Sequence, residues 1–140
     1  MLQIKKMELD EEIQSCFNVM SQLRPQIKEN EFISRIHLQM KSGYQLVAAL
    51  SNGEVAAIAG FHLHENLAWN KYLYIEDLVV DENKRSSGFG KKLLSWLHNE
   101  AEKNKCVQLH LDSGIQRKNA HRFYEREGMT FTSHHYVSQL

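Results

Sequence analysis

The sequence contains little cysteine, one proline and no net charge, and each shortage excludes a class of protein. Cys16 and Cys106 lie far apart without a CxxC or metal-ligand spacing, which indicates reduced thiols in a cytoplasmic protein rather than a disulfide framework. The 17 basic and 17 acidic side chains balance, so no excess charge attracts nucleic acid or a membrane surface. No apolar run approaches the roughly 20 residues that span a bilayer, and the first residues lack a signal-peptide pattern. We therefore expect a cytoplasmic protein with a small partner, and no nucleic-acid or membrane partner.

The pattern of apolar residues predicts one mixed α+β domain over residues 1–140. Neither linkers nor repeats interrupt the chain, and its length suits one domain. Strand-like segments occur at 2–7, 44–50, 54–64, 71–80 and 107–111, with a last strand or pair of very short strands at 129–137. Helical spacing occurs at 10–24, 29–41, 91–102 and 117–126. The order of these segments predicts a mixed sheet with helices packed against it.

A glycine-containing segment, Arg85-Ser86-Ser87-Gly88-Phe89-Gly90, joins the strand ending at Val80 to the helix predicted at 91–102. Unpaired N–H groups at a helix start and the helix dipole favour a phosphate there, and glycine lets a ligand approach the backbone. The spacing matches neither the dinucleotide fingerprint GxGxxG nor the P-loop GxxxxGK. A purely structural turn explains these six residues equally well when they are considered alone.

Together with the Lys/Leu-rich helix after it, the RxxGxG spacing resembles the acyl-coenzyme A pyrophosphate loop of the GCN5-related N-acetyltransferases (GNAT). Residues 120–129, AHRFYEREGM, resemble the second signature of this family, AxxFYxxxGF, with Met129 in place of the final phenylalanine. The resemblance is close over residues 44–133 and extends over the first 43 residues only by the order of elements. It implies a mostly antiparallel mixed sheet, splayed between its fourth and fifth strands and flanked by about four helices.

The resemblance also implies a function. It implies acetyl transfer from acetyl-CoA to a primary amine of a small molecule or a protein, by direct attack on the thioester in a ternary complex and without a metal. The alternative is an acyl-CoA-binding or sensor module of the same fold without turnover. A third possibility is a small binding domain without coenzyme affinity. Exposed sheet edges in small domains of this kind favour a homodimer.

Two residues are candidates for proton transfer. Tyr124 shares a helical stripe with Ala120 and Phe123, and in the resembling family the tyrosine at this position protonates the coenzyme sulfur. A core tyrosine with a hydrogen-bonded hydroxyl is the structural alternative. Glu76 interrupts an apolar strand, where desolvation would raise the pKa of a carboxyl group toward neutrality. Strict alternation places Asp77 on the opposite face. We favour Glu76 as the base, with Asp77 as a structural partner of an arginine or a loop N–H; a water chain is the alternative to either.

The resemblance assigns coenzyme contacts to the strand end, the glycine-containing segment and the last helix. In this family the strand backbone pairs with the pantetheine amides like an added strand. Arg117 occupies a position where many members have asparagine, and nearby Asn119 is the substitute. The expected coenzyme-binding residues are Leu78, Val79, Val80, Arg85, Ser86, Ser87, Gly88, Phe89, Gly90, Lys91, Asn119 and Tyr124.

Histidine is abundant, with eight residues, and two of them form a pair on one strand face. His62 and His64 lie two residues apart, but no carboxylate or thiolate is spaced with them as a metal site requires. We therefore expect no metal site. His62, His64 and His121 are instead candidates to line the acceptor site and to shuttle protons.

Overall fold

The computed structural model describes residues 1–85 and 87–140, so Ser86, one of the expected coenzyme contacts, lies outside the described residues. The chain forms two compact units, Met1–His110 and Leu111–Leu140. That residues 1–140 act as a single domain stays a prediction.

A five-stranded sheet dominates the first unit. Its strands, in the order β1-β2-β3-β4-β5, are β1 (Leu2–Lys6), β2 (Gln45–Ser51), β3 (Glu54–Asn66), β4 (Asn70–Val80) and β5 (Gln108–Leu111). The first three neighbouring pairs are antiparallel. The N–H of Val107 donates to the carbonyl of Lys71 at 2.8 Å, so β5 begins beside the beginning of β4 and runs parallel to it. The predicted mixed, mostly antiparallel sheet is confirmed.

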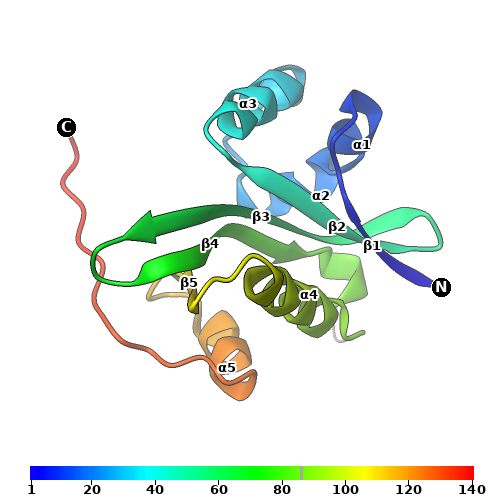
Figure 1. Cartoon of the computed structure of the whole chain (residues 1–140). Helices are drawn as coiled ribbons and strands as arrows, with labels where there is room; N and C mark the ends of the chain where they lie inside the picture. Colours follow the sequence, from blue (N-terminus) through cyan, green and yellow to red (C-terminus); the bar gives the residue numbers. More distant parts are fainter. Residues whose placement is uncertain (86) are drawn as a thin grey trace. The chain divides into compact units, whose positions relative to one another are not determined.

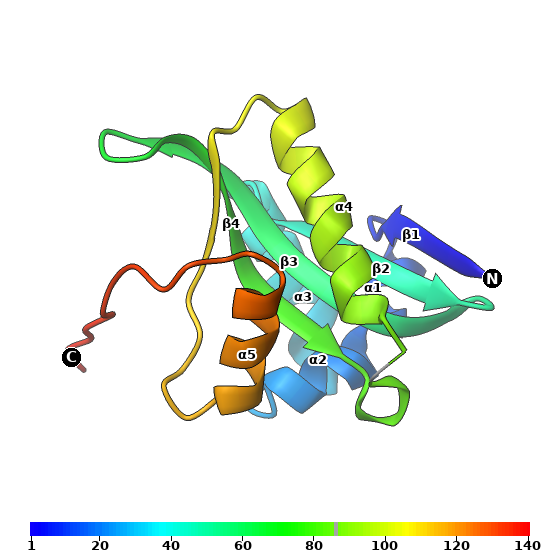
Figure 2. The same cartoon turned by 90° about the horizontal axis from the view of Figure 1, so that it is seen from below.

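Helices cover both faces of this sheet (Figures 1 and 2). On one face lie α1 (Asp10–Ser15), α2 (Phe17–Leu23) and α3 (Glu29–Lys41), and on the other lies α4 (Phe89–Lys103). The α1–α3 face buries one apolar cluster, because the apolar residues of these helices recur at helical spacing. On the α4 face, Trp96 packs edge to face against Phe61, with 6.1 Å between ring centroids.

Two predicted elements differ from the structure. The helix predicted at 10–24 is interrupted at Cys16, whose N–H donates to Ile13 in a tight turn, so two short helices replace one. The described residues therefore include five α-helices rather than about four, and the short 3₁₀ helix η1 (Glu82–Lys84). No strand forms at 129–137. Alternation creates a strand only where a partner strand buries its apolar side, and Phe131 and Val137 remain exposed.

The second unit contains one helix, α5 (Lys118–Arg126), followed by an irregular segment. The helix ends at Gly128, whose φ of 94° lies in the left-handed region that glycine adopts without strain. The N–H of Met129 donates to the carbonyl of Tyr124 at 3.0 Å and closes this end. The helix predicted at 117–126 is confirmed.

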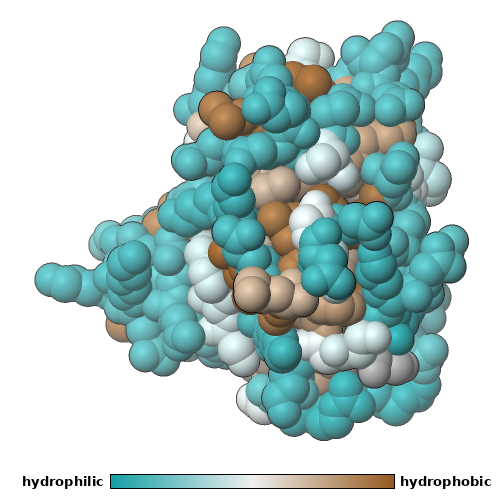
Figure 3. Space-filling view, turned by 90° about the vertical axis from the view of Figure 1, so that its right-hand side faces the viewer, coloured by the Kyte–Doolittle hydropathy of each residue, from teal (hydrophilic) through white to brown (hydrophobic). Residues whose placement is uncertain are grey.

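The surface in Figure 3 is mostly hydrophilic, with hydrophobic residues gathered near the middle of the face shown. Within residues 1–85 and 87–140, no helix combines the length and apolarity needed to cross a membrane.

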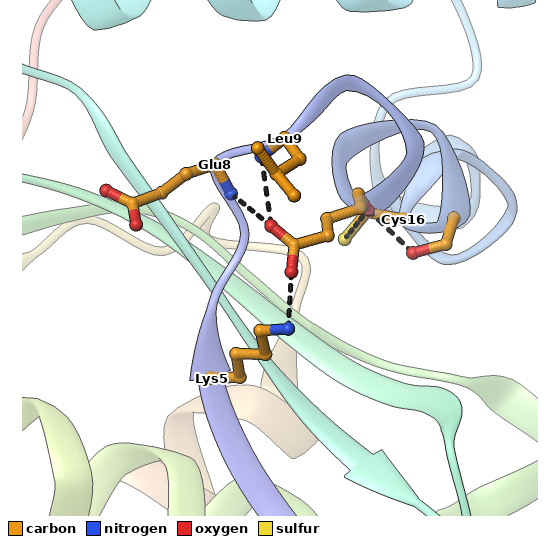
Figure 4. Close-up of polar contacts among 6 residues, drawn as sticks. Lys5, Glu8, Leu9 and Cys16 are labelled. Carbon is orange, nitrogen blue, oxygen red and sulfur yellow. Dashed lines mark hydrogen bonds and ion pairs between the residues drawn. The ribbon is translucent and has the colours of Figure 1, made fainter.

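The start of α1 is held by Glu12 (Figure 4). One oxygen of this carboxylate accepts the N–H groups of Glu8 at 3.0 Å and Leu9 at 2.9 Å, and the other pairs with Lys5 of β1. These contacts lower the pKa of Glu12 to about 2, the hydrogen bond from Lys5 being the largest cause. Glu12 therefore links the first strand to the first helix.

Candidate active site

A β-bulge in β4 places two carboxylates side by side. Gly60 of β3 is opposite Asp77 and Phe61 is opposite Ile75, so Glu76 is the extra residue without a register partner. Such an insertion shifts the alternation of side chains at that point. The prediction that Glu76 and Asp77 point to opposite faces is therefore wrong: both carboxylates reach the neighbouring rings of Tyr44 and His62.

Asp77 forms the buried half of the bulge. Its side chain is 14% exposed and accepts hydrogen bonds from Tyr44 Oη at 2.8 Å and from Arg24 Nε at 2.9 Å. Arg24 also donates from Nη2 to the backbone carbonyl of Glu76 at 2.9 Å, and so satisfies a group at the bulge. The expectation that Asp77 serves as a structural partner of an arginine is confirmed.

Gly60 makes this arrangement sterically feasible. A Cβ at this position would lie 1.7 Å from Tyr44 Oη, so a larger residue would displace the tyrosine from Asp77. Burial raises the pKa of Tyr44 well above 10, and the neighbouring Asp77 charge adds to the shift, so the hydroxyl stays protonated and donates. Sequence reasoning missed Arg24, Tyr44 and Gly60. The isolated glycine in an apolar strand was the available signal, since it is typical of a bulge or a close approach.

Glu76 forms the accessible half of the bulge. Its side chain is 37% exposed, so the expectation of a desolvated carboxylate in mid-strand is wrong. The bulge turns Glu76 out of the regular ladder, which explains its access to solvent. One carboxylate oxygen, Oε1, lies 2.8 Å from Nδ1 of the buried His62. The result is a carboxylate with access to solvent on one side and a buried imidazole on the other.

The predicted coenzyme loop directly follows β4 and η1 and leads into α4. Gly88 is the N-cap residue of α4, with φ of 82° in the left-handed region, and a Cβ there would meet nothing within 4 Å. No described side chain caps this helix start, so its first N–H groups stay available to a ligand. Arg85 and Lys91 are exposed beside it. These features fit a pyrophosphate.

Contacts with α2 and β3 hold the segment that leads into this loop. Asp81 donates its N–H to the carbonyl of Ala56 at 2.8 Å, and Gln22 of α2 accepts from the N–H of Glu82 at 2.9 Å. Lys84 pairs with Glu54 at 3.3 Å. The last residues of β4 precede this segment, with Leu78, Val79 and Val80 in register with Ala59, Ile58 and Ala57.

Tyr124 and Asn119, the remaining predicted site residues, lie on α5 in the second unit. Tyr124 is buried, and burial raises the pKa of its hydroxyl, while the charge of Arg117 and a hydrogen bond with it lower the pKa in part. Asn119 accepts a hydrogen bond from Arg122. Arg117, the departure from the family pattern, is thus a neighbour of Tyr124. The structure brings Glu76, the β4 end and the glycine loop together within the first unit.

The cysteines and histidines form no competing centre. No group of three His, Cys, Asp or Glu residues suited to a metal occurs in the part of the chain that the structure describes. Both cysteines are free thiols. Burial raises the pKa of Cys16 to about 12 and also raises the pKa of Cys106. Neither thiol is therefore activated as a nucleophile.

Comparison with known proteins decides the family. The model of the acetyltransferase (GNAT) family matches residues 7–129, most of the chain. The chain belongs to the GNAT family. Its members use acetyl-CoA, and the chain is an N-acetyltransferase by this membership and by its relatives.

Two relatives carry the same activity in their names. An uncharacterized N-acetyltransferase of Bacillus subtilis (strain 168), YhdJ, is 32% identical over 136 residues, which cover 96% of each chain. The aminoalkylphosphonate N-acetyltransferase of Salmonella typhimurium is 37% identical over 81 residues, which cover 57% of this chain and 53% of the relative.

A solved structure supports the fold. The aminoglycoside N-acetyltransferase AAC(6')-Iy, in complex with CoA, superposes with a TM-score of 0.88 at 13% identity, covering 100% of this chain and 95% of the other. At this identity the likeness concerns the fold alone. It agrees with the GNAT sheet predicted from the two motifs.

Proposed function

We propose that this GNAT protein transfers the acetyl group of acetyl-CoA to a primary amine of a small molecule, by direct attack on the thioester in a ternary complex. The observation that carries the proposal is the placement of Glu76 on the strand that leads into the glycine loop. The proposed proton acceptor and the proposed anion-binding helix start thereby lie on consecutive elements, β4 and α4, of the first unit. A protein amine is the broader alternative for the acceptor.

Acetyl-CoA as substrate fits the groups along β4 and α4. The helix start at Gly88, with Phe89, Gly90 and Lys91 in the first turn of α4 and Arg85 and Ser87 before it, would hold the pyrophosphate through N–H groups and charge. Asn119 is the proposed contact from α5. The end of β4 would bind the pantetheine, since β5 has four residues, begins beside Lys71, and is too short to reach Leu78, Val79 and Val80.

Proton transfer in the proposed reaction uses Glu76 and Tyr124. A substrate amine is mostly protonated near neutral pH, because an alkylammonium has a pKa of about 10.4. Glu76 accepts the proton, the amine nitrogen bonds to the thioester carbonyl carbon, and the carbon–sulfur bond breaks. Tyr124 gives its proton to the departing thiolate, and the second proton that the nitrogen loses as the amide forms returns to Tyr124 by way of water. Its raised pKa keeps this hydroxyl protonated until that step.

A small acceptor is favoured by the balanced charge of the chain and by the relative whose name specifies an aminoalkylphosphonate. No excess of charge provides a binding surface for a highly charged macromolecule. A cytoplasmic location and a homodimer remain predictions.

Calorimetric titration with acetyl-CoA, followed by a panel of small primary amines assayed by free-thiol release, tests the proposal. Binding with amine-dependent thiol release is expected. Binding without release from any amine would instead favour the non-catalytic acyl-CoA-binding module. Absence of binding would contradict both.

The role of Tyr124 has its own test. We expect Tyr124→Phe to lower kcat about 10- to 100-fold, less than the largest acid–base effects because a thiolate is already a fair leaving group. Tyr136→Phe is the matched control, because Tyr136 is exposed in the same unit. An undiminished kcat in Tyr124→Phe would remove Tyr124 from the mechanism.

A further inference from the structure

A buried imidazole lies directly behind the proposed base. His62 is 5% exposed, and its Nδ1 is 2.8 Å from Glu76 Oε1. The two atoms are within ion-pair distance, and Nδ1 has no hydrogen-bond partner within residues 1–85 and 87–140. Burying a polar atom without a partner costs free energy. Burial of this imidazole therefore lowers the stability of the fold, and folding alone does not explain its presence.

Among the groups around His62, the carboxylate that contacts the imidazole is Glu76. Tyr44 meets the imidazole edge to face at 5.6 Å between centroids, and His64 stacks on it at 4.9 Å. Tyr74 of β4 is the register partner of His62.

The other charged groups nearby are already paired. Asp77 holds Tyr44 and Arg24, which face the bulge from the start of β2 and the end of α2. The imidazole thus has one ionic neighbour among the described side chains, and that neighbour is Glu76.

An exposed carboxylate alone is poorly matched to the proposed proton transfer. An ordinary glutamic acid has a pKa of about 4.3, whereas an ordinary imidazole has about 6.5. General bases work best when their pKa lies near the operating pH. A carboxylate that shares its proton with an imidazole is a better match near neutrality than a carboxylate that water surrounds.

We propose that His62 is a positioning residue that acts with Glu76 as one proton-accepting pair. This inference rests on the proposed function and deepens it. Glu76 takes one proton from the substrate ammonium, the resulting carboxylic acid aligns with Nδ1 of His62 and passes the proton to it, and an imidazolium–carboxylate pair remains. After product leaves, water removes the proton at the exposed side of Glu76. No oxidant or additional reactant is needed.

Two substitutions of His62 distinguish its polar contact with Glu76 from its ability to take up a proton. His62→Asn offers an amide group near the Nδ1 position but does not titrate, and His62→Leu offers neither. His37→Asn is the matched control, since Nε2 of His37 on α3 lies 2.7 Å from a carboxylate, Asp10, outside the residues assigned to the site. Acceptor ionisation is common to all three variants and cancels in the comparison.

The readouts are kcat against pH at saturating substrates, acetyl-CoA affinity and thermal unfolding. We expect His62→Leu to lower kcat about 10- to 100-fold at pH 7. His62→Asn should recover part of this rate but lose the rise of kcat between about pH 6 and 7 that an imidazole contributes. Affinity for acetyl-CoA should remain within error of the wild type, and the unfolding temperature of His62→Leu should not fall, because this variant buries no unpaired nitrogen. His37→Asn should keep the wild-type pH profile.

One measurement does not depend on activity. In the resting protein at pH 7, Glu76→Gln should change the ¹⁵N chemical shift of His62 Nδ1, and Glu65→Gln, an exposed glutamate further along β3, should not. An unchanged shift, or wild-type rates and pH profiles in both His62 variants of an active enzyme, would overturn the pair. A wild-type protein that acetylates no amine would instead overturn the proposed function, whatever the ¹⁵N result.

Discussion

The bulge of β4 and the turn before α4 lie along one stretch of chain but depend on different parts of the sequence. Asp77 of the bulge is held by Arg24 and Tyr44, which are 53 and 33 residues away. The turn depends on Gly88 and on the N–H groups that follow it, all within a few residues. The bulge is thus built from distant side chains, and the turn from local backbone. Damage to the first should affect chemistry and folding, and damage to the second should affect coenzyme binding.

The largest effect should come from Glu76→Gln. Loss of a general base lowers kcat by about 10²- to 10⁴-fold. Because the Glu76 side chain is partly exposed and most of the bulge is held by Asp77, the free energy of unfolding should change little. Steady-state thiol-release kinetics and urea unfolding measure the two quantities.

Asp77→Asn is the matched comparison within the bulge. It weakens the contacts to Tyr44 and Arg24, so stability should fall together with the rate. Equal rates for Glu76→Gln and wild type would assign the base to water or to another group. Equal losses of stability in the two variants would remove the distinction between an accessible and a buried half.

The difference between the two regions also explains which features could be predicted from the sequence and which could not. The turn and α3 were predicted because glycine position and helical spacing are local signals, and the structure gives α3 as Glu29–Lys41. The bulge was not predicted, because its cause is the packing of Tyr44 against Gly60 across the sheet. One inserted residue brought Glu76 and Asp77 side by side instead of onto opposite faces. The strand expected at 129–137 failed because strand pairing is a tertiary property that alternation alone does not supply.

Gly60→Ala should have the largest effect on stability in the first unit. The new Cβ would overlap the buried Tyr44 ring, so the ring or the bulge must move, at a cost of about 1–3 kcal/mol. The value of kcat should fall as well, because Glu76 is the extra residue of the same bulge and would move with it. Tyr44→Phe is the control, since it removes the hydroxyl without adding volume. A loss of unfolding free energy in Gly60→Ala no greater than in Tyr44→Phe would show that the close approach is not what fixes the bulge.

Gly88→Ala tests the local half of the comparison. At φ of 82° a Cβ costs about 1–2 kcal/mol, and no neighbouring atom adds to this cost. Gly53→Ala carries the same backbone penalty in the β2–β3 hairpin, at φ of 83°. Both variants should therefore lose similar stability, but only Gly88→Ala should raise the Kd of acetyl-CoA, by about fivefold or more, with kcat preserved. Calorimetric titration of both variants decides it, and equal affinities would remove Gly88 from the coenzyme site.

The smallest effect should come from substitution of Glu12, a carboxylate outside both regions. It contacts the side chain of Lys5 on β1 and the backbone N–H groups of Glu8 and Leu9. Its pKa is lowered from 4.5 to about 2, so the folded state favours the charged form. The stabilisation is therefore complete above about pH 4.5 and is lost as the pH falls through about 2. Glu12→Gln should unfold at lower urea concentration than wild type at pH 7, with the difference shrinking toward pH 2 and with kcat unchanged. Glu11→Gln, at the neighbouring exposed position, should show no such convergence. If the difference in unfolding urea concentration between Glu12→Gln and wild type did not depend on pH, the start of α1 would be held by packing rather than by the carboxylate charge. The contrast between side-chain and backbone sites would then be limited to β4 and α4.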